Sequence, residues 1–111
     1  MKLYLSFPIT GHDLKERRQY AARTCAMLHV ERPDDIIINP FTIADKVLKK
    51  KMERTHTLDP PTYEEYMAAD LKELATCQLA IFAPGWQASE GCKMEMAMCK
   101  DKNIEVKFIH A

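Results

Sequence analysis

The chain has 111 residues, a length typical of one domain, and 47% of them are hydrophobic, which suffices for a single core. Lys and Arg together number 16, as do Asp and Glu, so the formal net charge is zero. This balance argues against a nucleic-acid partner or a membrane-surface partner. The N-terminal apolar run is too short for a signal peptide, and no segment approaches the roughly 20 apolar residues of a membrane span. We therefore expect one cytoplasmic domain, 1–111.

The first half of the chain predicts two strands and two helices. Residues 3–7 form a short apolar run that ends at Pro8, which predicts a buried strand followed by a loop. Apolar residues at helical spacing then predict a helix from Asp13 to about residue 30. A second strand is predicted at 35–39, where continuous apolarity favours a parallel strand covered on both faces and Pro40 ends it. The basic segment 43–54 predicts the second helix.

The second half continues this alternation. A helix is predicted at 62–76, a strand at 79–82, a helix at 89–102 and a last strand at 106–109. Strands that alternate with helices imply right-handed βαβ units. We expect a flavodoxin- or Rossmann-like three-layer α/β/α fold with a four- to five-stranded, mainly parallel sheet. In such sheets the site lies beyond the carboxyl ends of the strands, where loops 8–12, 39–45 and 83–89 meet.

Cysteine spacing bears on metal binding and on redox chemistry. The four cysteines, Cys25, Cys77, Cys92 and Cys99, form no CxxC pair. Cys92 and Cys99 stand seven residues apart in a helical pattern, hence about 10 Å along the axis, too far to share one metal ion. We expect reduced thiols that pack as small hydrophobic side chains, and no metal site.

Two carboxylates fall inside apolar helix faces. Asp70 lies in the stripe formed by Met67, Leu71 and Leu74, and Glu95 lies in the broad apolar arc of the 89–102 helix. A carboxylate in an apolar face costs several kcal/mol unless it is paired or hydrogen-bonded. Each acid alone is compatible with a satisfied structural carboxylate, but two near the same sheet edge favour a catalytic pair.

The start of the 89–102 helix offers a place for a ligand beside Glu95. Helical side chains lean towards the N-terminus, so Glu95 covers the turn that contains Gly91. The missing side chain at Gly91 leaves a slot there. Ser89 and the free N–H groups of the first turn can bind an anion or a hydroxyl.

Three sequence segments resemble the nucleoside 2-deoxyribosyltransferase superfamily: residues 4–11 (YLSFPITG), 66–71 (YMAADL) and 89–95 (SEGCKME). That group includes the 2′-deoxynucleoside 5′-monophosphate N-hydrolases and a branch of phage and bacterial proteins. The resemblance covers nearly the whole chain, and its most specific part is the Ser-x-Gly-x-x-x-Glu pattern at 89–95. It implies cleavage or transfer at the N-glycosidic bond of a nucleoside or nucleotide.

The resemblance also implies roles for individual residues. Glu95 matches the nucleophile that forms a glycosyl-enzyme ester, Asp70 matches an acid near the base and sugar, and Tyr4 matches a tyrosine that orients the nucleophile. The same motifs imply substrate contacts at Ser6, Ile9, Thr10, Gly11, Ser89 and Gly91. No cofactor is implied.

Departures from the family pattern leave other functions open. Phe7 replaces a glycine usual in the first loop, and Thr10 replaces an arginine of the nucleotide hydrolases. Some relatives supply a site residue to a neighbouring subunit from beyond the point that corresponds to Ala111. A non-catalytic nucleotide-binding module is the main alternative. A flavodoxin-like electron carrier fits the fold but lacks a phosphate-binding Ser/Thr/Gly loop after the first strand.

Further residues have both functional and structural interpretations. Tyr63 and Trp86 could stack on a nucleobase or pack at the rim of the core. The basic residues of segment 43–54 could clamp a phosphate or form a solvated helix face. Met96 and its apolar neighbours need a cover, supplied either by a loop or by a second subunit, so we expect a homodimer or a larger homo-oligomer.

Overall fold

The structure, a computed structural model, describes residues 1–9 and 11–109. Its elements follow one another along the chain as β1 (Lys2–Ser6), α1 (Leu14–Glu31), β2 (Ile36–Ile38), α2 (Pro40–Thr55), α3 (Tyr63–Leu74), β3 (Leu79–Phe82), the short 3₁₀ helix η1 (Trp86–Ala88), α4 (Glu90–Lys102) and β4 (Glu105–Phe108). The predicted three-layer α/β fold is confirmed, with a four-stranded sheet whose pairs are all parallel.

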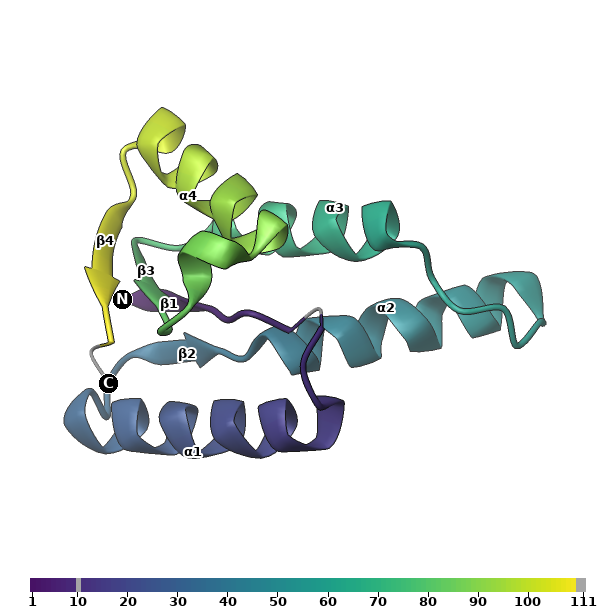
Figure 1. The fold of residues 1–111 in the computed structure, drawn as a ribbon, viewed down its shortest axis with the longest axis horizontal. Coiled ribbons are helices and arrows are strands. Elements are labelled where there is room, and N and C mark those ends of the chain that lie inside the picture. Colours follow the sequence, from purple (N-terminus) through teal and green to yellow (C-terminus); the bar gives the residue numbers. More distant parts are fainter. Residues whose placement is uncertain (10, 110–111) are drawn as a thin grey trace.

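The strand order of the sheet is β2-β1-β3-β4. The chain therefore moves outward from β1 to β2 and then crosses back to β3 on the other side of β1 (Figure 1). Such a reversal creates a crevice between the two inner strands at their carboxyl ends. Here that crevice lies beside Ser6 and Phe82, which are partners in the register of β1 and β3.

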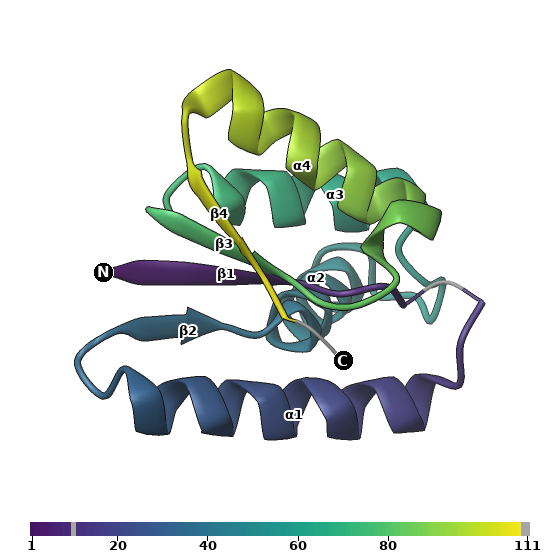
Figure 2. The same ribbon diagram turned by 60° about the vertical axis from the view of Figure 1, so that its left-hand side comes forward.

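Helices cover both faces of the sheet, as Figure 2 shows, with α1 on one side and α3 and α4 on the other. On the α1 face the core includes Leu3, Leu5, Ala21, Leu79 and Ile81. On the α3 and α4 face the core includes Tyr4, Leu74, Ala80, Phe82, Cys92, Met96 and Cys99. Met96, for which a cover from a second subunit or a loop was considered, is therefore buried within this chain.

Helix α2 leaves the sheet instead of packing back over it. It continues from the end of β2 away from the sheet, and α3 returns beside it, so the two form a projecting hairpin (Figure 1). Asn39 caps α2 by accepting a hydrogen bond from the Phe41 N–H at 2.9 Å. The predicted start at residue 43 was wrong, because a proline is well suited to the first helical turn, where its missing N–H has no partner to lose.

The course of α2 explains a second difference from the predicted fold. Strand β2 was expected to be covered on both faces, but it is an edge strand and Ile36 is 61% exposed. Its apolar sequence led to the wrong expectation, because the same three isoleucines are compatible with a central strand. Helix α2, which would complete the cover of β2, instead extends away from the sheet as part of the hairpin.

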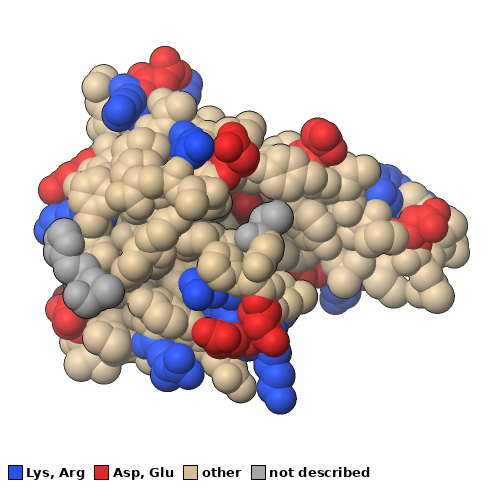
Figure 3. All heavy atoms as spheres, viewed as in Figure 1, with Lys and Arg blue, Asp and Glu red and all other residues tan. Residues whose placement is uncertain are grey.

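Charged side chains are mixed over the surface. Figure 3 shows acidic and basic groups scattered over one face of the molecule, without a broad area of one sign. Within residues 1–9 and 11–109, none of the helices combines the length and the apolarity needed to cross a bilayer.

Candidate active site

A cavity of about 300 Å³ opens at the carboxyl end of the sheet, beside the crevice between β1 and β3. Its wall comes from the segment after β1, the first turns of α1 and α2, one side of α3 and the start of α4. The lining is mostly apolar and aromatic, with Phe7, Ile9, Phe41, Tyr66 and Met67 among its members. A concave apolar pocket with a few polar groups is the usual form of a small-molecule site.

Glu95 is the central polar group of this wall. Its side chain lies on α4 in the core-facing arc and is only 5% exposed. The Ser6 hydroxyl at the end of β1 donates a hydrogen bond of 2.9 Å to Glu95 Oε1. The other carboxylate oxygen, Oε2, is buried and has no hydrogen-bond partner among the described residues. A buried carboxylate oxygen without a partner is costly, which marks it as a candidate functional group.

Asp70 lies on the same cavity, presented by α3. It is half-buried, and no hydrogen bond or ion pair to its carboxylate was found within the described part of the chain. Capping fixes the helix that carries it: Thr62 and Glu65 form a reciprocal capping box at the start of α3. The two acids from separate helices thus share one cavity.

Burial changes the acidity of both carboxyl groups. Loss of solvation raises the pKa of Asp70 to about 7 and the pKa of Glu95 to about 7. The negative charge of Asp70 raises the Glu95 pKa further, whereas the hydroxyl groups of Tyr4 and Ser6 lower it. Near neutral pH, each acid can therefore be present with or without its proton.

Tyr4 supports Glu95 from inside the core. Burial raises the pKa of Tyr4 well above its usual value, and the nearby carboxylates of Glu95 and Asp70 add to this shift. The phenol therefore keeps its proton at neutral pH and can act as a hydrogen-bond donor. Its position in the middle of β1 fixes the ring between the sheet and α4.

The slot expected at Gly91 is part of the cavity wall. A Cβ atom at this position would lie 3.3 Å from Met67 Sδ and 3.6 Å from the Tyr63 hydroxyl. Ser89 caps α4 by accepting a hydrogen bond from the Cys92 N–H at 3.3 Å. Ser89, Gly91 and Tyr63 all line the cavity, with Tyr63 47% exposed at its rim.

The remaining predicted site residues that the structure describes do not line the cavity. Tyr4 and Ser6 lie behind the lining, next to Glu95, whereas Gly11 is exposed in the loop before α1. Trp86 packs against Phe82 and stacks on Phe108 with ring centroids 5.7 Å apart, so it belongs to an aromatic cluster over β3 and β4. Thr10 lies outside the described residues.

Several lining residues were not singled out from the sequence. Arg18 and Leu14 come from the first turns of α1, and Phe41 follows the cap of α2. The Arg18 guanidinium lies 4.8 Å from the centre of the Phe41 ring and binds Asp45 through two contacts of 2.6 and 3.1 Å. Loop 39–45 was expected at this edge, but nothing in the sequence distinguished Phe41 from a core residue.

The cysteines match their predicted state as free thiols, with Cys77, Cys92 and Cys99 buried. Cys92 also lines the cavity, and burial raises its pKa above the ordinary value, which keeps it protonated at neutral pH. Among the residues described, no group of three or more His, Cys, Asp or Glu side chains could hold a metal ion.

The fold and the cavity define an α/β protein with a candidate small-molecule site at the switch point of a parallel sheet. The sequence profile of the domain of unknown function DUF4406 matches residues 1–108. The chain belongs to this family. A search of curated proteins and a search of solved structures found no match.

Proposed function

We propose that this protein cleaves, or transfers, the glycosyl group at the N-glycosidic bond of a nucleoside or nucleotide, with Glu95 as the nucleophile. The observation that carries this proposal is the state of the Glu95 carboxylate. It is buried at the cavity, one oxygen is oriented by Ser6, and the other has no hydrogen-bond partner among the described residues. The resemblance of residues 4–11, 66–71 and 89–95 to nucleoside 2-deoxyribosyltransferases gives the same role to this residue.

The proposed first step forms one bond and breaks another. A carboxylate oxygen of Glu95 attacks the anomeric carbon, and the bond from that carbon to the base nitrogen breaks with its electron pair on the base. Asp70, whose pKa is raised to about 7, supplies a proton to the departing base. Ser6 holds the Glu95 carboxylate in position during this step, and the protonated Tyr4 hydroxyl lies next to it.

In the proposed second step the glycosyl-enzyme ester is released. Water, or the nitrogen of a second base, attacks the anomeric carbon and displaces the Glu95 carboxylate. Asp70, now ionised, accepts the proton that the incoming nucleophile loses. Cys92 is a poor alternative nucleophile, because its buried thiol stays protonated.

Release of free base tests this proposal. The protein is incubated with a panel of deoxynucleosides, ribonucleosides and their 5′-monophosphates, and free base is measured by chromatography. We expect release from at least one member of the panel, and loss of that activity in Glu95→Gln. Asp101→Asn, an exposed change on the same helix, should keep full activity. Undiminished release by Glu95→Gln would exclude the nucleophile role.

A second candidate function is binding of a nucleotide without turnover. It is favoured by Phe7, which is 5% exposed and contributes to the cavity wall where the resembling family has a glycine. Calorimetric titration with the same panel separates the two functions. The binding module would be favoured by two results together. The wild-type protein would bind a member of the panel saturably but release no base, and a substitution that places a larger side chain in the cavity would abolish the binding.

A further inference from the structure

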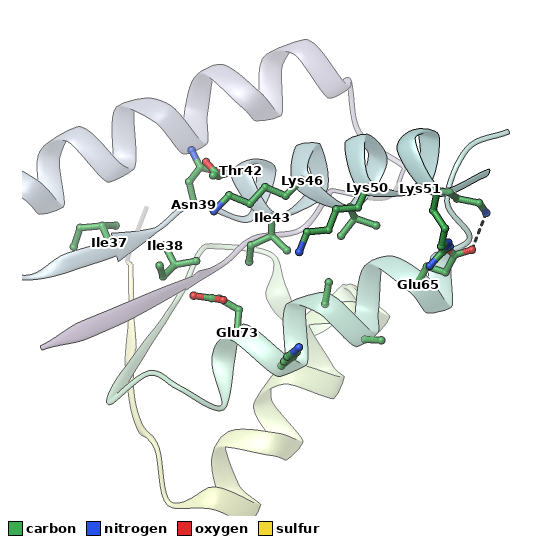
Figure 4. Close-up of a pocket in the computed structure, with 15 residues that line it drawn as sticks. Ile37, Ile38, Asn39, Thr42, Ile43, Lys46, Lys50, Lys51, Glu65 and Glu73 are labelled. Atoms are coloured by element: carbon green, nitrogen blue, oxygen red, sulfur yellow. Dashed lines mark hydrogen bonds and ion pairs between the residues drawn. The ribbon is translucent and has the colours of Figure 1, made fainter. Parts of the chain in front are cut away.

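The hairpin of α2 and α3 encloses a second groove that the proposed chemistry does not use. Its volume is about 540 Å³, and none of its lining residues is shared with the cavity around Glu95. The groove exists because α2 leaves the sheet, so that the space over β2 where a helix would normally pack is left open. Figure 4 shows this space between the two helices.

The floor of the groove is apolar and made of small or branched side chains. Ile38 at the end of β2, Ile43 and Val47 on α2, and Ala68 and Ala69 on α3 all line it. The two alanines let another backbone approach α3 closely. The lining on α2 runs from Thr42 to Arg54, a rise of about 18 Å along the helix. An elongated apolar groove of this length fits about three turns of a helix.

The sides of the groove carry positive charge that the described part of the chain leaves unpaired. Lys46 and Lys50 stand one helical turn apart on α2, and Lys72 stands on α3. In Figure 4, Lys46 and Lys50 leave α2 and reach into the space between the helices. None of these three lysines takes part in an ion pair among residues 1–9 and 11–109.

The acidic residues of the groove already have partners. Glu65 binds Lys51 at 2.8 Å and lies 3.9 Å from Arg54, and Glu73 binds Lys2 at 2.8 Å. The groove is therefore apolar at its floor and has a surplus of cations at its sides, although the whole chain has no net charge. A ligand that complements this groove has an apolar face for the floor and acidic groups flanking that face for the lysines.

We propose that this groove binds an acidic amphipathic helix of a partner protein. Leucine-type side chains of that helix fill the floor over Ala68 and Ala69, and carboxylates one turn apart pair with Lys46 and Lys50 on one side and Lys72 on the other. A nucleic acid would use the cations but not the apolar floor. A lipid surface is favoured by large exposed apolar side chains, whereas this floor consists of alanine, valine and isoleucine side chains between two helices. The proposal is independent of the chemistry at Glu95.

A model peptide tests the proposal directly. The probe is a fluorescent peptide of about 14 residues, close to four helical turns, with leucine along one face and glutamate at positions four residues apart. Fluorescence anisotropy measures its binding to the full chain. We expect saturable binding that weakens with added salt, and at least tenfold weaker binding of a peptide in which lysine replaces each glutamate.

Matched variants of α2 and α3 locate the contact. Lys50→Glu combined with Lys72→Glu should weaken binding of the peptide at least tenfold. Lys49→Glu is the control, because Lys49 is adjacent in sequence to Lys50 but does not line the groove and faces the side of α2 that carries Asp45, Leu48 and Met52. It should change the dissociation constant less than twofold. Ala68→Phe, which fills the floor at an exposed position, should also weaken binding at least tenfold.

Four results would overturn the proposal. They are no saturable binding of the glutamate peptide, equal binding of the lysine peptide, an equal loss in Lys49→Glu, and tighter binding of a single-stranded oligonucleotide that is lost in the double variant. The last result would identify a nucleic-acid site instead. Circular dichroism and thermal unfolding of each variant show whether it is folded, independently of any activity at Glu95.

Discussion

Asp70 and Glu95 lie in one cavity with similar acidity, and their proposed roles require opposite protonation states. The nucleophile must be ionised and the acid must carry its proton, while burial brings the pKa of each carboxyl group to about 7. Because two interacting groups titrate as a pair, the fraction with the productive arrangement is largest near pH 7. We therefore expect a bell-shaped pH dependence of kcat/KM centred near neutrality.

Asp70→Asn separates the two limbs of that profile. An asparagine cannot supply the proton, so kcat should fall by about 10²–10⁴-fold. The alkaline limb should disappear, because it reports loss of the Asp70 proton, whereas the acid limb, which reports protonation of Glu95, should remain. Steady-state rates of base release between pH 5 and pH 9 measure both effects. An alkaline limb that persists in Asp70→Asn would assign it to another group.

Single residues of the site could be predicted where a charged residue interrupts an otherwise apolar helix face. Asp70 and Glu95 interrupt apolar helix faces, and that conflict is visible without coordinates. Trp86 carries no such signal, because its neighbour Phe108 is brought to it only by the pairing of β3 with β4. Arg18 was missed for the opposite reason: a charged residue early in an exposed helix is unremarkable until the cavity beside it is known.

At the scale of elements, the first turn of α4 combines a helix cap with a cavity wall. Ser89 satisfies an N–H of that turn, and Gly91 keeps the space between Met67 and Tyr63 open. A glycine inside a helix lowers stability by roughly 1 kcal/mol relative to alanine. Its presence here is therefore explained by the space it leaves and not by the helix.

Gly91→Ala tests this explanation. The added Cβ would lie 3.3 Å from Met67 Sδ, at the flexible end of a side chain that can shift by a few tenths of an ångström. The thermal midpoint should stay the same or rise slightly, because the gain in helix propensity offsets the crowding. The KM for substrate should rise about tenfold, since the cavity narrows beside Glu95. An unchanged KM would mean that substrate does not reach the Gly91 wall.

The boundaries of most elements could be predicted because caps and prolines are local signals. Asp13 caps the start of α1, and Pro8 follows shortly after the end of β1. The direction of α2 could not be predicted. Its pattern of apolar and basic residues is compatible with a helix packed on the sheet and with one that extends beyond it, and only packing against α3 distinguishes them.

At the scale of the molecule, the site lowers the stability of the fold that carries it. The pKa of Glu95 is about 7 in the folded protein, above its ordinary value of 4.5, so the folded protein binds more protons than the unfolded chain in this range. The contribution of Glu95 to the free energy of unfolding therefore decreases as the pH rises from about 4.5 through about 7, and levels off above that. Asp70 acts in the same direction, because its pKa is also raised to about 7.

Glu95→Gln should recover part of the free energy of unfolding that the ionised Glu95 side chain costs at high pH. Glutamine has nearly the same shape, and its carbonyl oxygen can still accept a hydrogen bond from Ser6 in place of Glu95 Oε1. The charge penalty disappears, so at pH 8 the variant should be more stable than the wild type by about 1–2 kcal/mol, after allowing for the burial of the amide. At about 4–8 °C per kcal/mol, the melting temperature should rise by several degrees.

The same variant should lose this advantage in acid. At pH 5 the Glu95 side chain is already protonated in the folded protein, so wild type and Glu95→Gln should melt within about 2 °C of each other. Thermal unfolding from pH 5 to pH 8 measures the difference, with Glu64→Gln, an exposed change on α3, as the control that should show no such trend. A constant difference across this range would mean that Glu95 titrates outside it. The buried carboxylate would then be ionised in the folded protein from pH 5 to pH 8, and partners of Glu95 would have to compensate its charge.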